Sequence, residues 1–175
     1  MGRATAPADA APAPYREARF WTPRIDVRQA PDGTIYVEQK LPLPPYPDRI
    51  TEPLLDWAER APERTLFTAR GADGEWQRLT FAGAVDRMRR LGQFLLDAGL
   101  SARRPLVILS GNDLDHAALA LAAIHVGVPY AAVSPAYSLV SKDFERLRDV
   151  FAILDPGMVF AVDAARFRPA IDAVA

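Results

Sequence analysis

The sequence contains no cysteine, which excludes disulfide bridges, a thiol nucleophile and a thiolate metal site. It has only two histidines, His116 and His125, and these are too few to predict a metal centre. Proteins of reducing compartments do without disulfides, so the lack of cysteine fits an intracellular location, and we expect a cytoplasmic protein. The sequence therefore predicts no metal site.

An excess of charge of either sign is also missing. The 21 basic and 22 acidic side chains nearly cancel, so no strong attraction to nucleic acid or to an anionic membrane is expected. The N-terminus lacks an apolar core of signal-peptide length. The most apolar stretch, residues 117–133, is interrupted by His125, Gly127 and Pro129 and is shorter than the roughly 20 residues of a membrane span. We therefore expect a soluble protein with neither nucleic acid nor membrane as a partner.

A strand followed by a helix lies at the centre of the chain. Residues 106–109 read Leu-Val-Ile-Leu, an uninterrupted apolar run typical of a strand covered on both faces. Turn-forming residues follow, and Asn112 or Asp113 can cap the next helix. From Leu114 onward apolar residues occupy all sides, which predicts a helix packed into the interior, with Leu121 at its centre.

The end of this helix is marked by Gly127, a natural C-terminal cap, and by Pro129, which cannot continue a helix. Residues 130–133 then read as a second strand. A strand, a buried helix and a strand form a βαβ unit, which is almost always a right-handed crossover in a parallel sheet. The sequence therefore predicts an α/β fold with parallel-sheet βαβ layers and flanking helices.

The N-terminal region, residues 1–47, is expected to be an extension of this domain. Residues 1–14 are rich in alanine and proline and are expected to be disordered, whereas Phe20 and Trp21 are large enough to dock on a surface. Residues 35–37 are predicted to form one arm of a hairpin. The proline-rich residues 41–47 are interpreted as a stiff spacer, with a polyproline ligand as the alternative.

The second region, residues 48–175, is predicted to be the α/β domain. Its turn residues and apolar periodicities place further elements around the central unit. These are a short helix capped by Thr51, a hairpin of residues 65–69 and 75–79, a helix from Thr80 to Gly99, a helix capped by Ser141, a strand of residues 158–162 and a helix from Ala164.

Three groups of polar residues are candidates for chemistry. The turn Ser110–Gly111–Asn112 opens a helix, where an anion can bind, but it lacks the glycines and the lysine of a phosphate cradle, so we favour a plain turn. A hydrolytic triad is a second candidate, because the residue types it needs are present in Ser110, His116 and either Asp113 or Asp115. No GxSxG elbow is present, however, and we reject the triad. The loop after the second strand offers weak candidates for substrate binding. They are Ser134, Tyr137 and Ser138.

Residues 48–162 resemble the start of the adenylate-forming enzymes, which include acyl- and aryl-CoA ligases. The likeness rests on residues 57–64 (WAERAPER), 78–81 (RLTF), 107–112 (VILSGN) and 127–135 (GVPYAAVSP), in this order and spacing. A closer likeness, to feruloyl-CoA synthases, rests on further motifs. They are Phe20-Trp21, residues 32–36 (DGTIY), Pro44, Tyr46, Pro47 and residues 134–141 (SPAYSLVS).

The resemblance implies the incomplete N-terminal subdomain of a ligase that joins a hydroxycinnamate to AMP and then to coenzyme A. The family uses ATP, Mg²⁺ and CoA, but its glycine-rich phosphate loop, ribose-binding acid and catalytic lysine have no counterpart here, where Lys40 and Lys142 are the only lysines. We therefore assign no catalytic or cofactor-binding residue and expect the chain alone to be inactive and to self-associate. The alternative is a self-standing α/β module that binds a partner or a nucleotide without catalysis.

Overall fold

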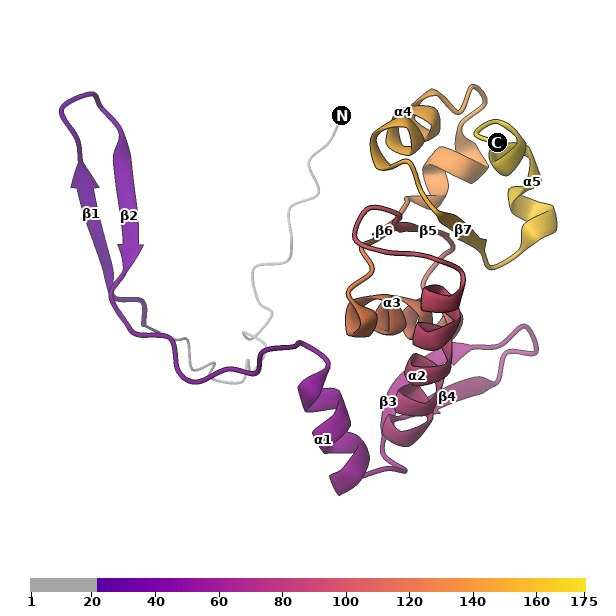
Figure 1. The fold of residues 1–175 in the computed structure, drawn as a ribbon, viewed down its shortest axis with the longest axis horizontal. Coiled ribbons are helices and arrows are strands. Elements are labelled where there is room, and N and C mark those ends of the chain that lie inside the picture. Colours follow the sequence, from indigo (N-terminus) through magenta and orange to yellow (C-terminus); the bar gives the residue numbers. More distant parts are fainter. Residues whose placement is uncertain (1–21) are drawn as a thin grey trace, which may run out of the picture. The chain divides into compact units, whose positions relative to one another are not determined.

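The computed structural model of the protein describes residues 22–175. The chain divides into two compact units, Met1–Tyr46 and Pro47–Ala175, which we describe separately (Figure 1). The predicted disorder of residues 1–14 and the predicted docking of Phe20 and Trp21 lie outside the described residues.

The described part of the first unit is an antiparallel hairpin of β1 (Ile25–Gln29) and β2 (Ile35–Gln39), in which Val27 lies opposite Val37. Its turn contains Gly33 at φ +88°, a left-handed conformation that glycine adopts without strain. On the face opposite Val27, Lys40 Nζ lies 3.4 Å from Asp26 and 2.8 Å from Glu38. The predicted hairpin arm is confirmed.

The second unit is built on a three-stranded parallel sheet with the order β6-β5-β7. The central strand β5 (Leu106–Leu109) is fully buried, as its apolar run predicts. Its neighbours are β6 (Tyr130–Ala132) and β7 (Met158–Ala161). The predicted βαβ unit and the third strand are therefore confirmed.

Helices cover both faces of this sheet (Figure 1). On one face lie α2 (Phe81–Asp97) and α3 (Leu114–Val126). On the other face lie the π-helical turn η1 (Ala136–Val140), α4 (Glu145–Leu154) and α5 (Ala164–Asp172). Since successive side chains of a strand point to opposite faces, Leu106 and Ile108 belong to the first core and Val107 and Leu109 to the second.

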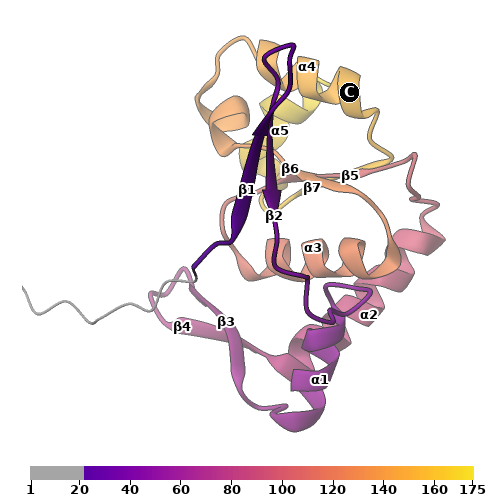
Figure 2. The same cartoon turned by 90° about the vertical axis from the view of Figure 1, so that its left-hand side faces the viewer.

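A second layer packs beneath α2 and α3 (Figure 2). Helix α1 (Glu52–Arg60) contacts α2. Strands β3 (Thr65–Arg70) and β4 (Trp76–Thr80) form an antiparallel hairpin, which also contacts α2. Thr80 caps α2 as predicted, because its side chain accepts a hydrogen bond from the Gly83 amide at 3.1 Å.

The prediction that α3 is buried on all sides is wrong. Ala118, Leu119, Ala122 and Ala123 are buried, but Leu121 is only half-buried and Ile124 is 37% exposed. The reason is that α3 packs against α2 and the sheet with one face, whereas the face carrying Leu121 and Ile124 lines an open cavity beside β3. Leu121 is therefore not the centre of the buried surface.

The start of α4 also differs from the prediction. The helix begins at Glu145, and Phe144 occupies its N-cap position with φ +54°. Ser141 does accept a hydrogen bond from the Phe144 amide at 3.1 Å, so its hydroxyl closes the turn before the helix rather than capping the helix itself. The π-helical turn η1 had no counterpart in the predicted elements.

Candidate functional site

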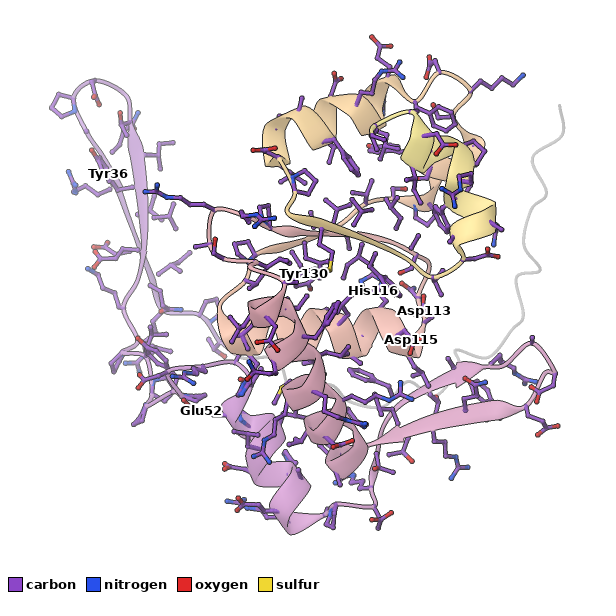
Figure 3. All side chains as sticks on the ribbon, turned by 45° about the vertical axis from the view of Figure 1, so that its right-hand side comes forward. Tyr36, Glu52, Asp113, Asp115, His116 and Tyr130 are labelled. Carbon is purple, nitrogen blue, oxygen red and sulfur yellow. The ribbon has the colours of Figure 1, made fainter. Side chains whose placement is uncertain are left out.

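The polar residues of interest lie at the carboxyl edge of the parallel sheet, where β5 leads into α3 and β6 leads into η1. Ligands of open α/β sheets bind at this edge. Figure 3 shows Asp113, Asp115 and His116 grouped at the start of α3, apart from Tyr130 at the start of β6.

Ser110 and His116 form a contact that the sequence does not predict. The Nδ1 atom of His116 lies 2.8 Å from Ser110 Oγ and 3.0 Å from the carbonyl oxygen of Gly111. Because a carbonyl only accepts, Nδ1 carries the proton, and Ser110 Oγ donates to the same carbonyl at 3.1 Å. A protonated Nδ1 is no base toward the serine, and Ser110 is only 4% exposed. The pair therefore forms a partly buried hydrogen-bond network that closes the turn.

The carboxylate of Asp113 caps α3, as predicted for this position. Its Oδ1 atom accepts a hydrogen bond from the backbone amide of His116 at 2.7 Å. Its Oδ2 atom is buried and has no hydrogen-bond partner among the described residues. A negative charge thus already occupies the helix N-terminus where an anion would bind, and the geometry supports a plain turn over a phosphate site.

An open cavity of about 400 Å³ runs along the exposed face of α3. Its walls are mainly apolar, from Phe67 on β3 to Ile124 on α3 and Tyr130. Asp113 and His116 lie at its polar end. Asp113 and His116 are already hydrogen-bonded within the β5–α3 turn, and most of the remaining wall is apolar.

The three predicted substrate-binding residues lie together in the segment after β6, although their role stays a prediction. Ser134 is exposed. Tyr137 is half-buried, and the guanidinium carbon of Arg146 lies 5.8 Å from the centre of its ring. Ser138 is only 5% exposed, and its Oγ has no hydrogen-bond partner among the described residues. Solvent therefore reaches Ser134 and part of Tyr137, whereas the Ser138 side chain is covered.

Thr51 takes part in a tertiary hydrogen bond instead of capping α1, so the predicted cap is wrong. The residue is at the N-cap position but makes no side-chain capping bond. Its Oγ1 lies 3.0 Å from His125 Nδ1, 74 positions along the chain. Thr51 is 1% exposed and His125 half-buried. The contact ties the start of α1 to the last turn of α3.

We expect Thr51→Val to lower the free energy of unfolding by about 1–3 kcal/mol, because it leaves the His125 Nδ1 atom without its partner in a partly buried position. Urea titration measures the loss. Thr68→Val, on the exposed part of β3, is the matched control, with an expected change within about 0.5 kcal/mol. Equal effects of the two changes would contradict the role given to the Thr51–His125 contact.

The described residues 22–175 offer no group of three or more His, Cys, Asp or Glu side chains that could hold a metal ion. In the same part of the chain, no helix has the length and apolar character needed to cross a membrane.

A three-layer α/β unit with a parallel sheet and a polar carboxyl edge defines the class of protein, and comparison with known families gives the family. The profile of the family described as AMP-binding enzyme matches residues 54–174, so the chain belongs to this family. Searching the curated proteins returns no match.

Solved structures show the same fold. An acyl-CoA synthetase from Brucella canis has 24% identity and a TM-score of 0.55, over 67% of this chain and 21% of that one. A fatty acid AMP ligase from Legionella pneumophila has 12% identity and a TM-score of 0.56, over 64% and 19%. VinN, in complex with 3-methylaspartate, has 22% identity and a TM-score of 0.59, over 73% and 33%.

These likenesses establish the fold and its extent. The chain spans about a fifth to a third of the length of these structures and corresponds to the N-terminal part of the adenylate-forming ligase fold. The matched family segment begins at residue 54, so the β1–β2 hairpin lies outside it.

Proposed function

We propose that the chain supplies the N-terminal part of a feruloyl-CoA-synthase-like ligase. Such an enzyme joins the carboxylate of a hydroxycinnamate to the α-phosphate of ATP, releases pyrophosphate, and transfers the acyl group from AMP to the thiol of coenzyme A. The observation that carries the proposal is the AMP-binding family match over residues 54–174, combined with the feruloyl-CoA-synthase-like run SPAYSLVS at residues 134–141.

In this proposal the chain provides scaffold and one wall of the substrate cleft. The run of residues 134–141 leaves β6 at the carboxyl edge of the sheet, the edge at which open α/β sheets bind ligands. Tyr137 offers an aromatic ring face with a basic side chain beside it, which suits a planar aromatic acid. Ser134 offers an exposed hydroxyl to a polar substituent of the ring.

The residues of this chain do not fit ATP, Mg²⁺ or CoA. The sequence has no glycine- and hydroxyl-rich phosphate loop, and the N-terminus of α3 is already occupied by the Asp113 carboxylate. The described residues contain no carboxylate cluster for a metal ion. In this proposal these groups are held by other parts of the ligase, and the chain alone does not bind them productively.

The proposal is tested in a chimera in which residues 1–175 replace the corresponding part of a feruloyl-CoA synthase. We expect Tyr137→Ala to raise KM for ferulate about 5- to 30-fold, the equivalent of one lost aromatic contact of about 1–2 kcal/mol. Formation of feruloyl-CoA is followed by its absorbance.

Val140→Ala, at a side chain 75% exposed in the same turn η1, is the matched control and should leave KM unchanged. Coumarate, caffeate and a medium-chain fatty acid are compared in parallel. A Tyr137→Ala chimera with unaltered KM for every hydroxycinnamate would remove Tyr137 from the substrate cleft. Preference of the parent chimera for the fatty acid would contradict the proposed substrate class.

We further propose that the protein acts in the cytoplasm, in the breakdown of phenylpropanoid acids, without a nucleic acid or membrane partner. The absence of cysteine and the near balance of 21 basic and 22 acidic side chains support this proposal. Cell fractionation checks it, and recovery of the protein in the membrane fraction would contradict it.

A further inference from the structure

The segment that joins β6 to α4 contains a rare kind of helical turn. In η1 (Ala136–Val140) the backbone amide of Ser141 donates to the Ala136 carbonyl, five residues back, at 3.0 Å. An α-helical turn uses the carbonyl four residues back instead. The π-helical turn therefore holds one residue more than an α-helical turn, and turns of this kind occur frequently at functional sites.

The hydroxyl of Ser138, in the middle of this turn, has no hydrogen-bond partner among the described residues. Ser138 is only 5% exposed, and its Oγ atom is buried. Because the described residues themselves enclose this atom, a segment that packs on their surface would not pair it. An unpaired buried hydroxyl disfavours the conformation that buries it by roughly 5- to 150-fold in an equilibrium constant. The π-helical turn thus carries an unfavourable group at its centre.

A second unfavourable feature lies at the end of the same segment. Phe144, at the N-cap of α4, has φ +54° and ψ +20°. A bulky residue rarely adopts this left-handed conformation, because its Cβ comes too close to the following carbonyl oxygen. Two contacts hold Phe144 there. Its amide donates to Ser141 Oγ at 3.1 Å, and its side chain packs against the core that includes Leu147 and Phe167.

We propose that residues 136–144 form a two-state element, in which η1 exchanges between the π-helical turn and an α-helical turn. In the second state the Val140 amide donates to the Ala136 carbonyl, as in an α-helix, and the extra residue passes into the turn before Phe144. This change rewinds η1 and rotates its side chains about the helix axis. Ser138 leaves its buried position, and Phe144 leaves the left-handed region.

Opposing contributions keep the two states close in free energy. The π-helical turn packs Tyr137 and Leu139 against the second core, and this burial stabilises it. The unpaired Ser138 hydroxyl and the left-handed Phe144 act against it, and the α-helical turn relieves both. An element with such compensation has a second state that is populated enough to be measured.

The exchange gives the carboxyl edge of the sheet a hydroxyl that only one state exposes. The segment leaves β6 at this edge, and in the α-helical state Ser138 is free to bond a polar ring substituent of an aromatic acid beside Tyr137. A ligand that bonds only this state shifts the population toward it. This use of Ser138 rests on the proposed function. The exchange itself is a property of the chain alone and is measured without substrate.

The exchange is tested by nitrogen-15 relaxation dispersion on the 175-residue chain, which detects motion between microseconds and milliseconds. We expect exchange at the amides of residues 138–144 and flat profiles at β5. Ser138→Ala removes the unpaired hydroxyl and so favours the π-helical turn. It should lower the population of the second state about 5- to 150-fold and flatten the profiles. Spectra at two protein concentrations separate this motion from self-association.

Ser101→Ala is the matched control, because it makes the same chemical change at an exposed serine outside the segment. It should leave the profiles of residues 138–144 unchanged, and circular dichroism verifies the fold of both variants. Flat profiles in the parent chain would overturn the proposal. So would exchange that grows with protein concentration, unaltered or steeper profiles in Ser138→Ala, or an equal effect of Ser101→Ala. None of these outcomes bears on the chimera assay, so a failure here and a failure of the proposed function are distinguishable.

Discussion

Replacing Leu119 with alanine is expected to lower the free energy of unfolding by about 2–5 kcal/mol. Leu119 is 5% exposed and belongs to the core formed by α2, α3 and one face of the sheet. The change removes buried methyl groups and leaves a cavity that the packed helices fill only in part. Helices α2 and α3 approach closely further along, at the C-terminal end of α3, since a Cβ at Gly92 of α2 would lie 2.8 Å from Val126 of α3.

Leu121→Ala removes the same atoms two positions along the same helix and is the matched control. We expect a loss of about 1 kcal/mol, since Leu121 is half-buried whereas Leu119 is only 5% exposed. Urea titration of both variants and of the parent chain gives the two losses in unfolding free energy. The dependence of the unfolding free energy on urea concentration should be equal for all three proteins, which checks that they unfold in a comparable way. A loss at Leu121 equal to or larger than that at Leu119 would mean that α3 presents its other face to the core.

The 175-residue chain, incubated with ATP, Mg²⁺, coenzyme A and ferulate, is expected to release no AMP above the blank. Adenylate formation needs groups that orient the phosphates and stabilise the charge that develops on them. The sequence has no phosphate loop for this purpose. Its two lysines, Lys40 and Lys142, lie outside any such loop, and Lys40 is paired with Asp26 and Glu38 in the first unit.

The chimera that carries residues 1–175 in a feruloyl-CoA synthase is the positive control for this assay and should release AMP with ferulate. AMP release by the 175-residue chain that grows with its concentration and survives repurification would contradict the expectation. It would favour catalysis by groups other than the phosphate loop and lysine of the family. An inactive chimera with an intact fold would instead count against the proposed function.

Short-range patterns in the sequence determined most of the elements of this protein. Four local features were predicted and are confirmed. They are the buried strand β5, the Asp113 cap at the start of α3, the Gly127 cap at the end of α3 and the Thr80 cap of α2. Each depends on residues within one or two turns of the chain, whose conformational preferences act locally. The same patterns supported the parallel sheet, because strand, helix and strand in succession permit few connections.

Only the tertiary structure decided which side of an element is covered and which distant residues meet. Leu119 and Leu121 are both leucines of one apolar helix, and the packing of α2 and the sheet buries the first more than the second. Thr51 fits its role as a local cap by sequence, yet its hydroxyl contacts His125. Such choices depend on which surfaces of distant segments come together, because a buried polar group takes whichever partner the packing brings within reach. No local pattern in the sequence encodes that partner.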